Sequence, residues 1–160
     1  MNQYECNKTI KYPYTNINVL PGDILYSSIG RSTYFVGHCI IIGTDNKIKE
    51  VLPGTPGWHT ITIGQFWNRH NKGDKIMLLR SAEGANEAAT WISKNLHLFK
   101  SYNLINYDIE NIEKSYCYKF VTQAYYFGAN VQIVTNMNRL LTPNDIKKSP
   151  KLDKIAVIVK

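Results

Sequence analysis

The sequence is poor in cysteine and contains no long apolar run. Only three cysteines, Cys6, Cys39 and Cys117, occur among 160 residues, and no two of them form a CxxC pair. A small, odd number of cysteines excludes a disulfide-rich scaffold, and the missing pairs exclude a zinc ribbon or a thioredoxin motif. Because no stretch of about 18 apolar residues is present, no transmembrane helix is predicted.

Acidic side chains are also scarce, with 12 against 19 lysines and arginines, and the formal net charge is +7. This excess favours an anionic partner such as an anionic lipid or a cell-wall polymer, and the C-terminal lysines predict a peripheral contact with an anionic surface. No glycine-rich phosphate loop or aromatic RNA-binding signature occurs, so no nucleic-acid partner is expected. Residues 1–20 lack the apolar segment of a secretion signal, which predicts a cytoplasmic protein.

The composition indicates one globular domain. Apolar residues make up 44% of the chain and aromatic residues 12%, which is enough to build a core without disulfides. The turn at Pro21-Gly22-Asp23 marks the expected start of this domain. We therefore expect an N-terminal extension over residues 1–20 and a single domain over residues 21–160. The oligomeric state is not predicted.

Strand patterns come before helix patterns along the chain. Residues rich in β-branched and aromatic side chains predict strands over 24–29, 34–43, 47–52, 60–63 and 75–79, with a hairpin turn at Thr44-Asp45-Asn46. Helical spacing of apolar residues then predicts helices over 85–99 and 115–128. A short helical segment opened by Pro143 and a strand over 155–159 follow. This order indicates an α+β fold with an antiparallel sheet.

Cys117 and His38 are the candidates for nucleophilic catalysis. Cys117 lies at the predicted N-terminus of the helix over 115–128, where backbone N–H groups and the helix dipole favour a thiolate. The alternative is a small core residue, because free cysteines are often buried. His38 lies in the most apolar strand, so it is either a general base or a core histidine with a hydrogen-bond partner. The other histidines, His59, His70 and His97, show no metal-ligand spacing and are expected on loops or the surface.

Glu50 is the candidate partner of His38. If residues 44–46 form the hairpin loop, positions whose numbers sum to 90 face each other, and Glu50 is a diagonal neighbour of His38 on the same sheet face. A carboxylate at this position could hold the imidazole in one tautomer. The alternative is a solvated glutamate on a strand.

The order of these motifs resembles the NlpC-type papain-like cysteine hydrolases, in their circularly permuted, YiiX-like branch. The similarity rests on Gly37-His38-Cys39-Ile40-Ile41-Ile42-Gly43, on Lys47-Ile48-Lys49-Glu50 and on Tyr116-Cys117-Tyr118-Lys119-Phe120-Val121, with the histidine ahead of the cysteine. It covers about residues 21–159. It implies a permuted papain-like fold with Cys117 as nucleophile, His38 as general base and Glu50 as the third triad member, and with no metal or other cofactor.

The resemblance also implies an activity. It predicts a bacterial cysteine peptidase or amidase that cleaves a peptide or peptidoglycan-like substrate through a thioester. Tyr102 and Tyr118 are predicted to bind substrate: the first matches a tyrosine upstream of the family's nucleophile, and the second replaces the usual serine after it. Lecithin retinol acyltransferase-like enzymes share the permutation, so acyl hydrolysis or transfer on a lipid is an alternative, with a groove near Tyr118, Trp58 and Phe35. A non-catalytic binding module with a degenerate site is a further alternative.

Overall fold

A computed structural model of the chain describes residues 9–28 and 37–160. Cys6 and Phe35 lie outside these ranges, as do residue 29 of the predicted strand over 24–29 and residues 34–36 of the predicted strand over 34–43. The helices and strands of the described residues are β1 Ile24–Ser27, β2 His38–Ile42, β3 Ile48–Val51, β4 Trp58–Ile61, α1 Ile63–Asn68, β5 Lys75–Ser81, α2 Ala85–Asn95, the 3-10 helix η1 Leu96–Leu98, β6 Ser101–Tyr102, β7 Lys114–Ser115, α3 Cys117–Ala129, α4 Pro143–Lys147 and β8 Leu152–Val159.

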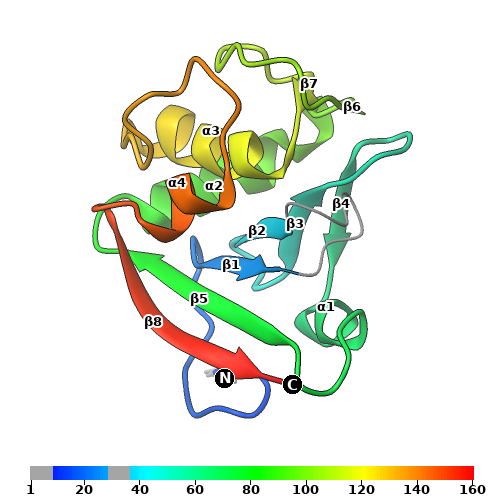
Figure 1. The fold of residues 1–160 in the computed structure, drawn as a ribbon, viewed down its shortest axis with the longest axis vertical. Coiled ribbons are helices and arrows are strands. Elements are labelled where there is room, and N and C mark those ends of the chain that lie inside the picture. Colours follow the sequence, from blue (N-terminus) through cyan, green and yellow to red (C-terminus); the bar gives the residue numbers. More distant parts are fainter. Residues whose placement is uncertain (1–8, 29–36) are drawn as a thin grey trace, which may run out of the picture.

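Six strands form one antiparallel sheet in the order β4-β3-β2-β1-β5-β8 (Figure 1). In the β2–β3 hairpin, Ile41 faces Lys49 and Ile42 faces Ile48. The residue numbers of each pair sum to 90, so the predicted hairpin register is confirmed. The α+β class, with an antiparallel sheet packed against helices, is also confirmed.

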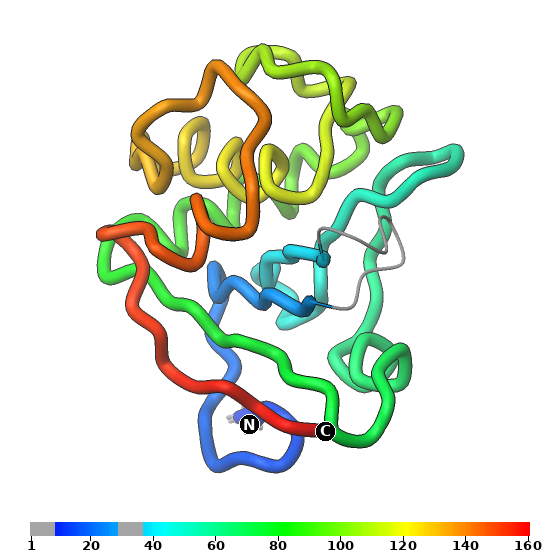
Figure 2. The backbone as a smooth tube through the Cα atoms, viewed as in Figure 1, coloured from blue at the N-terminus to red at the C-terminus, as the bar shows by residue number. Residues whose placement is uncertain are grey.

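The two faces of the sheet are covered by two separate cores. On one face, Ile24, Ile41 and Leu79 pack in a cluster with apolar side chains of α2, α3 and α4, the helices that lie above the sheet in Figure 2. On the other face, Leu25 and Ile40 pack with residues of α1 and of the segment before β1. Successive β2 residues therefore alternate between two buried faces, which explains why this strand is apolar throughout.

Two local features differ from the sequence-based expectation. The predicted strand over 60–63 ends at Ile61, because Thr62 starts α1: its side chain accepts a hydrogen bond from the Gln65 backbone N–H, and the Gln65 side chain accepts one from the Thr62 backbone N–H. Such a reciprocal capping box satisfies two N–H groups at a helix start. The second feature is the two-stranded parallel pair of β6 and β7, which lies directly before α3 in the chain and was not predicted.

The segment before β1 is fastened to the sheet by a buried carboxylate. Tyr12 is 1% exposed, and its hydroxyl donates to Asp23 Oδ2 at 2.8 Å. Arg80 of β5 donates through Nε to Asp23 Oδ1 at 2.7 Å, and the Leu20 backbone N–H also donates to this carboxylate. These bonds connect residues 12–23 to the centre of the sheet.

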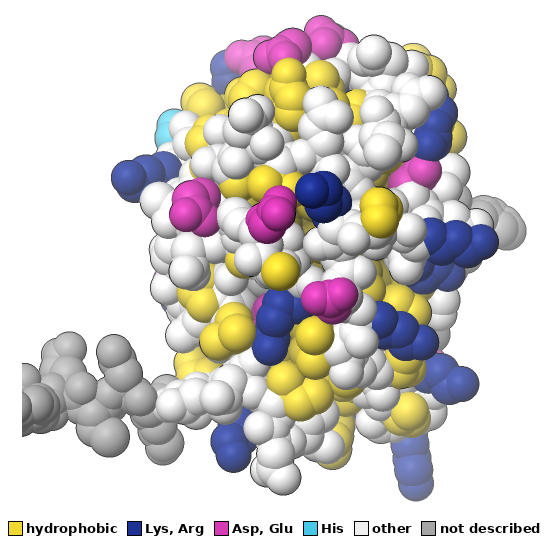
Figure 3. Space-filling view, turned by 90° about the vertical axis from the view of Figure 1, so that its left-hand side faces the viewer, with side chains coloured by type: hydrophobic (Ala, Val, Ile, Leu, Met, Phe, Trp, Pro, Cys, Tyr) yellow, Lys and Arg dark blue, Asp and Glu magenta, His cyan; other side chains and the backbone are white. Residues whose placement is uncertain are grey.

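Within the described part of the chain, no helix has the length and apolarity needed to cross a membrane. Figure 3 shows one side of the surface, on which lysine and arginine side chains are scattered among hydrophobic and polar ones, and acidic side chains gather near the top. On this side the positive net charge is not concentrated into one basic patch.

Candidate active site

Cys117 is the first residue of α3, as predicted. It is fully buried and belongs to the core between the sheet and the helices. Tyr116, the N-cap residue, makes no side-chain hydrogen bond to the helix start. The first backbone N–H groups of α3 are therefore not capped by that side chain, and they are the groups that would face a negative charge beside the sulfur.

His38 and Glu50 form a buried pair. His38 Nε2 lies 2.7 Å from Glu50 Oε2, and the two side chains are 4% and 0% exposed. The confirmed hairpin register brings them together from adjacent strands. The alternative of a solvated Glu50 is wrong, because this carboxylate has no contact with solvent.

The other ring nitrogen of His38, Nδ1, is not engaged by Glu50. Glu50 engages Nε2, and Nδ1 is buried without a regular hydrogen bond to any residue in the described ranges. Burial lowers the pKa of His38, but interaction with the Cys117 side chain and with Glu50 outweighs burial and raises the pKa to about 9. The imidazole therefore contacts a carboxylate and interacts with the Cys117 side chain, which are the partners expected of a base between a nucleophile and an orienting group.

Arg69 is the functional residue that the sequence analysis missed. It follows α1 as its C-cap, and its Nη1 lies 2.7 Å from Glu50 Oε1 and 2.9 Å from Oε2. Burial alone would raise the pKa of Glu50, but hydrogen bonds and positive charge from His38 and Arg69 lower it. Arg69 thus keeps the buried Glu50 ionised beside the imidazole.

A second histidine lies close to this group. His70 Nδ1 is 3.0 Å from the Phe66 carbonyl and Nε2 is 2.8 Å from Ser27 Oγ, so Nδ1 donates and Nε2 accepts. Burial lowers the pKa of His70, which favours this neutral form. His70 lies on the bend after α1, which agrees with the expected loop position, but it is buried and not at the surface.

Several tyrosines belong to the core that contains Cys117 or pack against it. Tyr118 is buried, and burial together with negative charge at Cys117 raises its pKa. Tyr102 of β6 and Tyr26 of β1 are partly buried and pack against the same core as Cys117. Trp58, predicted beside the site, packs there too. The substrate-binding roles of Tyr102 and Tyr118 stay predictions.

The sequence was then compared with known proteins. A family model described as lipoprotein N-acylation protein LnsA-like matches residues 2–149. The chain belongs to this family. A search among curated proteins finds no match.

The fold of the LnsA-like chain is similar to a solved structure, the metalloprotein YiiX from Escherichia coli O157:H7, with a TM-score of 0.60 and 15% sequence identity. The similarity covers 88% of this chain and 98% of YiiX. At this identity the match shows a shared fold alone. It agrees with the YiiX-like resemblance noted from the sequence motifs.

The similar structure, YiiX, is described as a metalloprotein. No group of three or more histidine, cysteine, aspartate and glutamate side chains that could hold a metal ion occurs in residues 9–28 and 37–160. In the candidate site, Glu50 is already engaged by His38 and Arg69. The donor set found here does not fit a resident metal ion, and no catalytic step is assigned to one.

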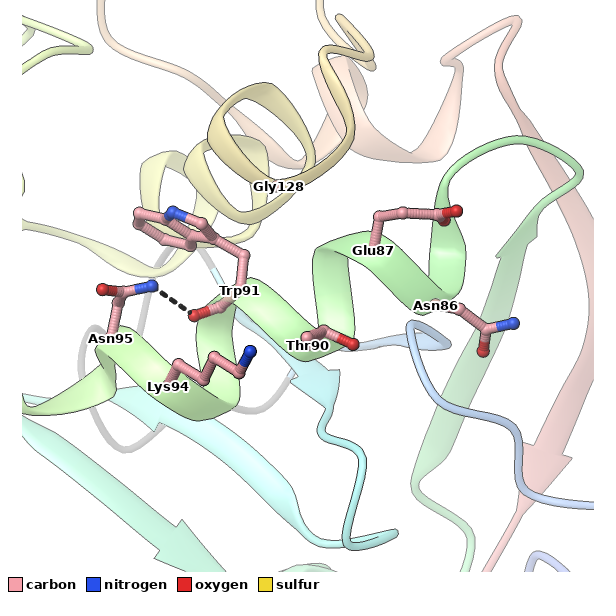
Figure 4. Close-up of a pocket in the computed structure, with 7 residues that line it drawn as sticks. All are labelled: Asn86, Glu87, Thr90, Trp91, Lys94, Asn95 and Gly128. Carbon is pink, nitrogen blue, oxygen red and sulfur yellow. Dashed lines mark hydrogen bonds between the residues drawn. The ribbon is translucent and has the colours of Figure 1, made fainter.

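A surface hollow of about 420 Å³ lies on the outer side of α2, away from the residues just described (Figure 4). Trp91 lines it and stacks on Phe127 with ring centroids 5.2 Å apart, and Glu87 and Lys94 lie along the same helix. None of the candidate catalytic residues lines this hollow.

Proposed function

We propose that this protein carries out acyl transfer in lipoprotein N-acylation, with Cys117 as the acyl-carrying nucleophile. The observation that carries the proposal is the hydrogen-bonded series from His38 through the buried Glu50 to Arg69, with the Cys117 side chain among the groups that raise the pKa of His38. The family description supplies the reaction class, because N-acylation joins an acyl group to an amine. This choice favours the lipid-acyl alternative of the sequence analysis over cleavage of a peptide bond.

In the first step, His38 holds the thiol proton of Cys117 as an imidazolium, and the sulfur, as a thiolate, attacks the carbonyl carbon of an ester-linked acyl chain. A C–S bond forms and the carbonyl π electrons move to oxygen. The resulting oxyanion is stabilised by backbone N–H groups at the start of α3. As the carbonyl re-forms, the C–O ester bond breaks, and the leaving alcohol takes the proton from His38. The product is an acyl-thioester on Cys117.

In the second step, the amine of the acceptor attacks the thioester carbonyl. A C–N bond forms, the C–S bond breaks, and the sulfur leaves as a thiolate. His38 accepts the proton lost by the amine, and the resulting imidazolium beside the thiolate is the starting state. An imidazolium takes part in both steps, and the ionised Glu50 stabilises its charge.

Mass spectrometry of the intact protein tests the proposal directly. The wild type is incubated with phospholipid vesicles and with a diacylglyceryl-cysteine peptide that has a free α-amine. We expect a mass increase of one acyl chain on Cys117 and an N-acylated peptide, both absent from the Cys117→Ser and His38→Ala variants. Cys39 is the internal control, since it is buried in the same core and burial raises its pKa.

Two outcomes would contradict the proposal. An N-acylated peptide formed equally well by Cys117→Ser would exclude the thioester. Cleavage of a peptide or peptidoglycan fragment without any acylated protein would instead favour the amide hydrolase predicted from the motif resemblance.

A further inference from the structure

A row of side chains crosses the sheet from the region of the thiol to the open edge at β8. Cys39 of β2 is paired with Tyr26 of β1, Tyr26 with Met77 of β5, and Met77 with Val157 of β8. Directly opposed residues in antiparallel strands project to the same face of a sheet. These four residues, called here the cross-strand row, therefore share one face.

The row lies where the cover of the sheet by helices ends. The neighbouring residues on the same face, Ile24 and Leu79, are fully buried in the core with the helices. In the row, Cys39 is buried, Tyr26 and Met77 are partly buried against that core, and Val157 is 40% exposed. Figure 1 shows β5 and β8 extending beyond the helices that cover the upper part of the sheet. The exposure of the row thus increases from the site toward the sheet edge.

The inner end of the row adjoins the candidate nucleophile. Tyr26 packs against the core cluster that contains Cys117. Burial raises the pKa of Tyr26, and the electrostatic effect of Cys39 and Cys117 raises it further. An acyl group bound to Cys117 therefore has an apolar surface beside it that leads out of the core.

We propose that the fatty-acyl chain of the substrate lies along the cross-strand row, over Tyr26, Met77 and Val157, while its carbonyl carbon is at Cys117. This assignment rests on the proposed acyl-transfer function and adds to it the place where the chain binds. Two interstrand steps separate Tyr26 from Val157, which is about 10 Å at the usual strand spacing. The row can therefore hold a medium-length segment of a chain, and longer chains would extend beyond the sheet edge.

The charge next to the row fits a phospholipid donor. Lys147 of α4 places its ammonium 4.9 Å from the centre of the Tyr26 ring. Among the described residues, no carboxylate forms an ion pair with Lys147. The phosphate of a phospholipid donor lies close to its ester bond, so it could pair with Lys147 at the thiol end of the row. An acyl ester without a phosphate has no group for this cation to bind.

The first test measures acylation of Cys117 by p-nitrophenyl butyrate, octanoate, laurate and palmitate. We expect the rate constant kcat/KM to rise by up to about fourfold for each methylene that enters the row, and to level off for chains that pass its end. Val157→Trp should fold, because tryptophan suits an exposed strand position. It should lower laurate acylation by about tenfold, the effect of roughly two lost methylene contacts, and leave butyrate acylation unchanged.

Val159→Trp is the matched control. Val159 lies on the same strand and faces Lys75 outside the row, with 50% exposure, so this variant should keep the wild-type preference for chain length. Val157→Asp is a second variant, which should lower laurate acylation through the cost of a carboxylate beside the chain. Circular dichroism confirms that each variant is folded.

The outcomes separate the two proposals. If no ester acylates Cys117 in the wild type, the proposed function fails. If all esters acylate it at similar rates, or if Val157→Trp and Val159→Trp lose laurate acylation equally, the function stands and the row is not the chain site. For the charge, Lys147→Met should raise KM for a phospholipid by about fivefold and leave p-nitrophenyl laurate unaffected. An equal effect of the neighbouring Lys148→Met would contradict this role.

Discussion

Replacement of Glu50 by glutamine tests whether the carboxylate stabilises a protonated His38. Glutamine keeps the size of the side chain and can accept one hydrogen bond, but it carries no charge. The pKa of His38 is raised from 6.5 to about 9, a difference that corresponds to roughly 3 kcal/mol of preference for the protonated ring in the folded state. The carboxylate is one of two contributors to this rise, after the Cys117 side chain.

The direction of the pH dependence follows from this shift. A histidine whose pKa is higher in the folded state stabilises the fold fully below its unfolded pKa of 6.5, and this contribution is lost as the pH rises through about 9. Glu50→Gln should therefore lower the free energy of unfolding by about 2 kcal/mol near pH 6.5, the lower end of the range from 6.5 to about 9. The difference from the wild type should narrow as the pH approaches 9.

Urea denaturation at several pH values across this range measures the difference, and NMR titration of the His38 ring protons measures its pKa in both proteins. Glu113→Gln is the control, because Glu113 pairs with Lys100 on the surface and both side chains are more than half exposed. It should show no comparable pH dependence between 6.5 and about 9. A loss of stability in Glu50→Gln that is constant over this range, with an unchanged His38 midpoint, would refute the reasoning.

Three further predictions concern the scaffold. Burial lowers the pKa of Lys119 from 10.5 to about 8. The free energy of unfolding of the wild type should therefore rise by up to about 3 kcal/mol as the pH rises from about 8 to 10.5. Lys119→Met should abolish this rise, as measured by urea denaturation at each pH. Tyr12→Phe should lower the free energy of unfolding by about 1–2 kcal/mol, because the hydrogen bond to Asp23 is lost. The control Tyr14→Phe, at an exposed position, should change it by less than about 0.5 kcal/mol in the same denaturation assay. Gly22→Ala should cost more than about 2 kcal/mol, seen as a lower Tm, because φ is +86° and a Cβ would collide with the first carbonyl of α2.

The parts of the site that could be predicted depend on local sequence. The three-residue loop at Thr44-Asp45-Asn46 sets the parity of the β2–β3 hairpin, and this parity brings His38 and Glu50 to the same face. Likewise, a change from strand to helix spacing marks the region in which α3 begins at Cys117. In both cases, residues close in the sequence are sufficient to predict the local structure.

The parts that could not be predicted depend on tertiary packing. Arg69 lies 19 residues after Glu50 and reaches it only because α1 folds under the sheet. The capping box at Thr62 and Gln65 was readable in the sequence, but the apolar residues around it also suit a strand. Lys119 looks like an ordinary surface lysine of a helix, yet its ammonium is buried and donates to three oxygens of residues 106–114. No local pattern distinguishes such a lysine from a solvated one.

The complete burial of Cys117 has a kinetic consequence. Peroxide and other oxidants react with a thiolate that they can touch, and the products beyond sulfenic acid are not readily reversed. A sulfur with no exposed surface meets them only during brief local openings of the surrounding residues. In the proposed reaction the same openings admit the acyl donor, so their frequency sets an upper limit both on the proposed turnover and on the rate of oxidation of the sulfur.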